Sequence, residues 1–145
     1  MEAVKKLPTS FWVIAGIGLV WNLIGLASFA MQMVATPEQM AEMYPTEAQQ
    51  AYVNAIPVWA TGAYALAVIA GVLGCVALLM RKSVAKILFG LSIAGVIVQN
   101  GYGFLVANGI EVFGLAATAL PILVIVIGVG LLIYTGRAES KGWVS

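Results

Sequence analysis

Uncharged hydrogen-bonding side chains lie within or at the ends of the long apolar stretches of this chain, and a site would have to be built from them. They are amides and phenols, namely Asn22, Gln32, Tyr64, Gln99, Asn100 and Tyr102. Such groups either hydrogen-bond neighbouring helices or line a small polar cavity, open to the outside, that binds a neutral solute. We favour helix contacts, worth about 0.6 kcal/mol each in membranes, because uncharged polar residues are commonly used in this way.

Catalytic and metal-binding chemistry lacks the residues that it needs. The chain contains no His, and its six acidic residues are all Glu and lie outside the apolar stretches. Cys75 lies inside one of these stretches, where a thiol stays protonated. General acid–base catalysis requires a titratable group in the site, metals require clustered ligands, and proton-coupled carriers keep an ionisable residue in the membrane. We therefore predict no enzyme activity, no cofactor and no metal.

The composition is that of a membrane protein. Of 145 residues, 62% are hydrophobic and 9% are charged, whereas a soluble domain carries about 25% charged residues. The apolar stretches cover residues 11–34, 58–80, 84–107 and 115–134, each near the ~20 residues that cross a bilayer as a helix. We predict an all-α membrane protein, with residues 1–145 forming a single four-transmembrane-helix bundle in a lipid bilayer. The net charge of +1 argues against a nucleic-acid partner.

The charged residues predict an orientation for this bundle. All seven basic residues lie before the first stretch, around the junction of the second and third, or after the fourth: Lys5, Lys6, Arg81, Lys82, Lys86, Arg137 and Lys141. The other gaps hold four glutamates and no Lys or Arg: Glu38, Glu42, Glu47 and Glu111. Because Lys and Arg are retained in the cytoplasm, we predict that both termini are cytoplasmic (N-in, C-in). We interpret the basic residues as topology signals only.

The first apolar stretch has an alternative interpretation as a cleaved signal peptide. Lys5 and Lys6 precede it, and Ser28–Ala30 has the small residues of a cleavage site. However, the apolar run exceeds the ~7–15 residues of a signal sequence and contains Trp21 and Asn22. We therefore favour a retained helix.

The outer segment, residues 36–57, carries two helix-start patterns. Thr36 precedes Pro37 and stands three residues before Gln39, and Thr46 stands three residues before Gln49. Apolar side chains, Tyr44 and Tyr52 among them, fall on one face of each piece. We predict two short amphipathic helices that lie on the outer membrane surface or cover the bundle. The other outer loop, residues 108–114, is expected to be a short turn.

Small residues recur at every fourth position on two of the stretches. One series is Ala63, Ala67, Gly71 and Cys75, and the other is Gly95, Gln99, Gly103 and Ala107. Small side chains let membrane helices approach closely, so each series predicts a helix interface, the second with a hydrogen bond from Gln99 across it. We favour a seam inside one chain, and contact with a second copy or another membrane protein is the alternative. Trp143 is expected to rest on the inner leaflet.

Several short motifs resemble a family of small, functionally uncharacterised bacterial inner-membrane proteins with four spans. They are Leu7-Pro8-Thr9-Ser10-Phe11-Trp12, Trp21-Asn22-Leu23-Ile24-Gly25, Pro57-Val58-Trp59-Ala60-Thr61-Gly62-Ala63-Tyr64, Gly74-Cys75, Arg81-Lys82 and Lys141-Gly142-Trp143. Some members of that family are labelled "sugar transporter". The resemblance implies a four-span fold in a bacterial inner membrane and transfers no site residue.

Two functions follow from these observations. The first is a membrane protein without catalytic residues that acts in interaction or assembly. The alternative is a small transporter or binding subunit for a neutral polar solute such as a sugar, which would use Asn22, Tyr64, Gln99 and Asn100. With four spans per copy, a transport path predicts an oligomer. An enzyme ranks third.

Overall fold

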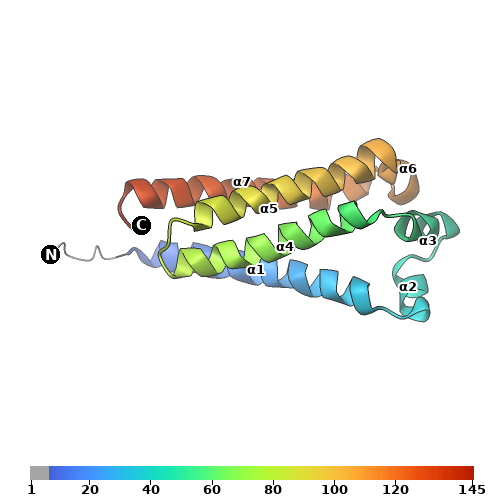
Figure 1. Cartoon of the computed structure of the whole chain (residues 1–145), viewed down its shortest axis with the longest axis horizontal. Helices are drawn as coiled ribbons and strands as arrows, with labels where there is room; N and C mark the ends of the chain where they lie inside the picture. Colours follow the sequence, from blue (N-terminus) through green and yellow to red (C-terminus); the bar gives the residue numbers. More distant parts are fainter. Residues whose placement is uncertain (1–6) are drawn as a thin grey trace.

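The computed structural model of the chain describes residues 7–145, and four long helices form its body (Figure 1). They are α1 (Thr9–Val34), α4 (Val58–Leu79), α5 (Ala85–Gly101) and α7 (Ala119–Ser140). A π-helical turn, η1 (Tyr102–Val106), extends α5, and a 3₁₀ turn, η2 (Leu115–Thr118), precedes α7. With these extensions, four helices of the described chain are long and apolar enough to cross a membrane, so that this part of the predicted fold is confirmed.

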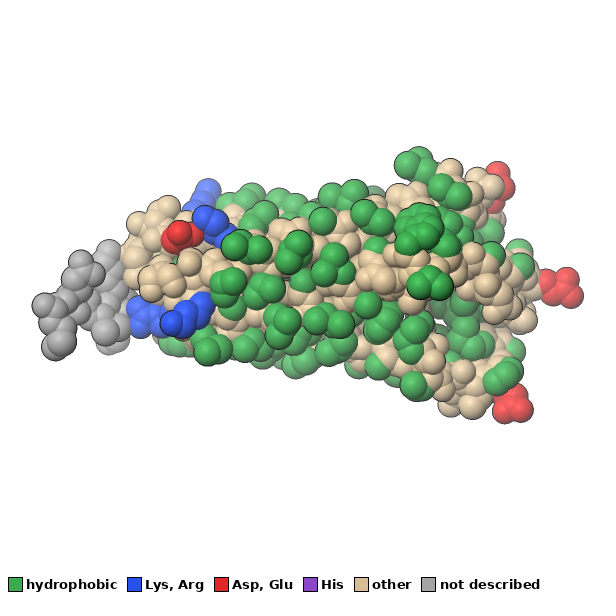
Figure 2. All heavy atoms as spheres, in the orientation of Figure 1, with side chains coloured by type: hydrophobic (Ala, Val, Ile, Leu, Met, Phe, Trp, Pro, Cys, Tyr) green, Lys and Arg blue, Asp and Glu red, His purple; other side chains and the backbone are tan. Residues whose placement is uncertain are grey.

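On the face shown in Figure 2, hydrophobic side chains extend along the length of the bundle and the charged side chains lie at its two ends. Side chains such as Ile17 and Val126 are 65% and 60% exposed, as expected of helices that face lipid. One end, here called the basic end, carries Lys and Arg; Lys5 and Lys6 lie outside the described residues. The other, here called the capped end, carries glutamates and the three short helices α2 (Pro37–Met43), α3 (Glu47–Asn54) and α6 (Gly109–Phe113).

The closest helix contact is between α4 and α5, where the two series of small residues meet. A Cβ atom added to Gly95 would lie 2.6 Å from the carbonyl oxygen of Ala63 and 2.9 Å from the amide nitrogen of Ala67. The predicted seam is therefore internal. The hydrogen bond across it, however, is donated by the Ser92 hydroxyl to the Ala67 carbonyl oxygen, 2.6 Å away, and not by Gln99. Positions four apart rotate about 40° per step around a helix, and Gln99 has thereby turned out of the seam.

The hydrophobic core lies in the half of the bundle near the basic end. Phe11, Leu78 and Phe89 are fully buried there, with Cys75 and Ala15 among them. The ring of Phe89 fills the space beside Gly74, where an added Cβ would lie 2.7 Å from Cε1. This half is closed because aromatic rings occupy the gaps that small residues leave open.

The C-terminal segment packs against this core through Trp143 and Val144, while the position of Trp143 at the inner leaflet stays a prediction. Its ring meets that of Phe11 edge-on, with centroids 6.2 Å apart, and Val144 is 3% exposed. Arg81 donates from Nε to the Trp143 carbonyl oxygen at 2.9 Å. The interpretation of the basic residues as topology signals only is wrong for Arg81, because this hydrogen bond joins it to the C-terminal segment.

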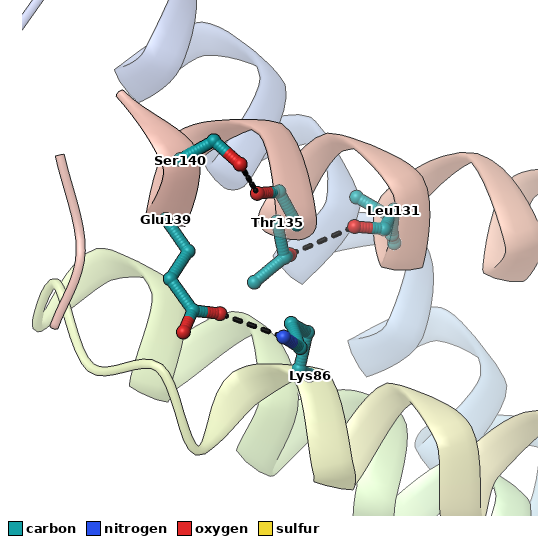
Figure 3. A network of polar contacts seen from close by, with 6 residues as sticks. Lys86, Leu131, Thr135, Glu139 and Ser140 are labelled. Atoms are coloured by element: carbon teal, nitrogen blue, oxygen red, sulfur yellow. Dashed lines mark hydrogen bonds and ion pairs between the residues drawn. The ribbon is translucent and has the colours of Figure 1, made fainter. Parts of the chain in front are cut away.

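A second basic residue links α5 to α7 at the same end (Figure 3). Lys86 Nζ lies 2.8 Å from Glu139 Oε2, and both side chains are about half exposed to solvent. Nearby, the hydroxyls of Thr135 and Ser140 donate to carbonyl oxygens one turn earlier in α7. Exposed ion pairs contribute about 0–1 kcal/mol, so this pair adds little to the stability of the bundle.

The short helices of the capped end start where capping residues occur. Thr36 Oγ1 accepts from the Gln39 amide, and Gln39 Oε1 accepts from the Thr36 amide in return; Thr46 caps α3. Residues 108–114 form more than the expected turn, because Gly109–Phe113 is helical. Asn108 and Gly114, both at positive φ, bend the chain on either side of it.

Candidate functional site

Two cavities occupy the half of the bundle near the capped end. Cavity A, about 320 Å³, lies among α1, α4, α5 and α7. Cavity B, about 240 Å³, lies between the mouth of the bundle and the short elements α2, α3, η1 and α6. All polar residues singled out in the sequence line one or both. Asn22 lines A, Gln32 and Tyr102 line B, and the residues common to both are Tyr64, Gln99 and Asn100.

The three shared residues carry hydrogen-bonding groups that the protein leaves unused. Within the described residues, no protein group bonds the Gln99 amide or the Tyr64 hydroxyl, and both side chains are partly buried. Asn100 donates from Nδ2 to the Val96 carbonyl oxygen at 2.9 Å, and its Oδ1 accepts no hydrogen bond from these residues. The Phe29 ring lies 4.9 Å from the Tyr64 ring and packs against it where cavities A and B meet. Since buried polar groups are normally satisfied, these groups suit water or a ligand.

Asn22 lies at the bottom of cavity A and belongs mainly to the helix contacts. Its Nδ2 donates to the Gly18 carbonyl oxygen at 2.8 Å and lies 3.4 Å from Cys75 Sγ. A Cβ at Gly71 would lie 2.9 Å from Asn22 Cγ, so the amide needs a glycine opposite it. The structural interpretation of Asn22 therefore fits this position better than a role in the cavity.

Gln32 and Tyr102 attach the short helices to the bundle. Gln32 donates from Nε2 to the Tyr44 hydroxyl at 3.0 Å, and the Tyr102 hydroxyl donates to the Ala55 carbonyl oxygen at 3.3 Å. The ring of Phe113, on α6, meets the Tyr52 ring edge-on at 5.0 Å. Tyr64, Gln99 and Asn100 are thus the predicted residues that border both cavities and form no hydrogen bond to another described element.

Sequence reasoning missed two residues of this region, Ser92 and Phe113. Ser92 stands three residues before Gly95 and therefore on the same helix face, which was a usable signal for a second seam contact. Phe113 lies in a segment expected to be a turn, and only the helical form of residues 109–113 directs it towards the α3 helix.

The electrostatics of the site favour uncharged ligands. The described residues that line the two cavities include no charged side chain. At the capped end, burial raises the pKa of Tyr44, and burial together with the nearby Tyr102 and Tyr44 phenols raises the pKa of Tyr52. These phenols therefore stay neutral at ordinary pH. An ion in such surroundings would lose its hydration without gaining a counter-charge.

The described residues contain no cluster of three or more His, Cys, Asp or Glu that could hold a metal ion. Comparison with protein-family models, curated proteins and solved structures gave no significant match. The resemblance to small bacterial four-span proteins stays a prediction, and the function has to be argued from the geometry of the site.

Proposed function

We propose that this protein is a membrane-embedded binding protein for a small, uncharged molecule that carries hydrogen-bonding groups. Tyr64, Gln99 and Asn100 are the ligand-contacting residues. The observation that carries the proposal is that these three residues border both cavities and present polar groups without protein partners, in surroundings without charge. Amides and phenols both donate and accept, which suits hydroxyl or carbonyl groups of a neutral ligand.

The packing supports binding ahead of assembly. The assembly hypothesis rested on the absence of titratable groups from the spans, on two small-residue faces and on the amphipathic outer segment. At Gly95 the two small-residue faces contact each other inside one chain, and the outer segment packs on the bundle through the hydrogen bond from Gln32 to Tyr44. These contacts are therefore made within the chain and do not require a protein partner.

The proposed orientation places the capped end outside a bacterial inner membrane and both termini in the cytoplasm. The support is the distribution of Lys and Arg against Glu along the chain. In this orientation cavity B faces the outer aqueous phase. The core around Phe11, Leu78 and Phe89 closes the cytoplasmic half, which favours binding over passage through one copy.

The test is equilibrium binding to the full chain in nanodiscs, with radiolabelled glycerol, glucose and monooctanoylglycerol as probes. We expect at least one uncharged probe to bind saturably and Gln99→Leu to weaken it tenfold or more. Val98→Leu is the matched control, because Val98 is the preceding residue of α5 and is 48% exposed on the outer face. Equal binding by native protein and Gln99→Leu, or no saturable binding of any probe, contradicts the proposal.

A further inference from the structure

Cavity A lies between two helices that do not close against each other. Helix packing runs in series, from α1 to α4, to α5 and to α7, and among the described residues α1 and α7 form no comparable pair. They meet towards the basic end, where a Cβ at Gly18 would lie 3.2 Å from Leu131 Cδ2. Nearer the capped end, cavity A separates them. The two helices therefore diverge from a closed base.

The wall of cavity A reaches the outer surface of the bundle along this divergence. Ile24 on α1 and Leu120 on α7 both line the cavity, and they are 60% and 62% exposed. Both belong to helices long and apolar enough to span a membrane. Ser28, also on this edge, donates its hydroxyl to the Ile24 carbonyl oxygen at 2.9 Å. An opening with apolar edges in a spanning segment faces hydrocarbon.

The lining of cavity A is divided between polar and apolar sides. The α7 side is wholly apolar, with Leu120, Pro121 and Val124. The α4 and α5 side presents Tyr64, Gln99 and Asn100. A volume of about 320 Å³ is near the lower end of ligand pockets, ~300–1,000 Å³, so it suits a head group whose chain remains outside.

We propose that the ligand is an uncharged lipid, with a hydroxyl- or carbonyl-bearing head group on an acyl chain, that enters cavity A from the bilayer between α1 and α7. The head group lies against Gln99, Asn100 and Tyr64, and the chain passes Ile24 and Leu120 into the hydrocarbon. This inference rests on the proposed function and names its ligand class and entry route. It excludes charged lipids, because the cavity offers their head groups no counter-charge.

The experiment photo-cross-links a diazirine-bearing monoacylglycerol to the full chain in nanodiscs and maps the adducts by mass spectrometry. We expect adducts on α1 and α7 beside cavity A. Leu120→Trp, which obstructs the opening, should lower them fivefold or more. Ile122→Trp is the matched control, because Ile122 is 58% exposed on the same helix and does not line cavity A; it should leave the yield unchanged.

A second pair of variants tests the same opening from α1. A side chain at Gly25 has room to start, since its Cβ would be 3.6 Å from Val68 Cγ1, and Gly25→Leu then extends into cavity A. Gly16→Leu is its control, because an added Cβ at Gly16 meets nothing within 4 Å. Gly25→Leu should lower the adduct yield and Gly16→Leu should not.

The outcomes separate the inference from the function on which it rests. If glycerol or glucose binding depends on Gln99 while the monoacylglycerol adducts ignore Leu120→Trp and Gly25→Leu, the lipid proposal is wrong and the solute site stands. If no probe depends on Gln99, both are wrong. A charged analogue, lysophosphatidic acid, that cross-links as well as the monoacylglycerol also overturns the inference.

Discussion

The two halves of the bundle are built from the same four long helices and are packed in opposite ways. Near the basic end, Phe11 and Phe89 fill the interior, and a glycine opposes the Phe89 ring. Near the capped end, Tyr64 and Gln99 border two cavities and bond no described protein group. The closed half therefore positions the helices, whereas the hollow half has room for a ligand.

The seam between α4 and α5 runs beside both halves, and substitutions there should lower the stability of the protein the most. Gly95→Ala forces a Cβ against backbone atoms of Ala63 and Ala67, which cannot rotate away as a side chain can. We expect a loss of about 3 kcal/mol, the upper part of the range for overpacking. Unfolding by steric trapping in bicelles measures it. Gly90→Ala, on the same helix in open space, is the control, and equal stabilities would refute the seam.

A matched pair of glycines compares the halves directly. In the closed half, Gly74→Ala drives a Cβ to 2.7 Å from the Phe89 ring and should cost about 2 kcal/mol. In the hollow half, the Cβ of Gly25→Ala would lie 3.6 Å from Val68, which is an ordinary van der Waals distance. The higher helix propensity of Ala should offset any small loss of packing. The same unfolding assay should place Gly25→Ala within about 0.5 kcal/mol of the native protein. Equal losses would mean that the halves are packed alike.

The polar residues should also differ in role, one contributing to stability and the other to ligand binding, with smaller changes in stability than the glycine substitutions. Ser92→Ala removes the hydrogen bond to the Ala67 carbonyl and should cost about 0.6 kcal/mol. Gln99→Leu removes a group without a protein partner and should leave stability unchanged while it weakens ligand binding. Unfolding and binding measured on the same preparations check this. A stability loss at Gln99 larger than at Ser92 would assign Gln99 to structure.

The smallest expected effect is alkaline loosening of the capped end. Tyr52 has a pKa raised by burial and neighbouring phenols, so folding favours its neutral form. A group with a raised folded pKa contributes stability below its unfolded pKa of about 10, and that contribution is lost as pH rises through the folded value. A tyrosinate absorbance titration should extend above pH ~10, and Tyr52→Phe should reduce the absorbance change above that pH. If Tyr52→Phe leaves the titration above pH ~10 unchanged, the Tyr52 ring is exposed to water.

Much of the fold was readable because its signals are local. Apolar runs of membrane-crossing length predicted the four helices, and Thr36 marks the start of a capped helix in the structure as in the sequence. The hydrogen bond assigned to Gln99 failed because residue spacing alone does not say where a helix face leaves its neighbour. The contact of Trp143 with Phe11 was not predicted, because Phe11 lies at the other end of the chain.

The amino-acid sequence alone indicates that the protein is surrounded by lipid, that its fold is helical and that the polar side chains in the interior of its spans are uncharged. Hydrophobicity, helix capping and residue chemistry are properties of short segments and need no partner to be evaluated. Only the packing of the helices places Tyr64, Gln99 and Asn100 at two cavities and brings Asn22 against Cys75 of α4. The reason is that a cavity is left where α1 and α7 diverge, and that divergence depends on how all four helices pack together.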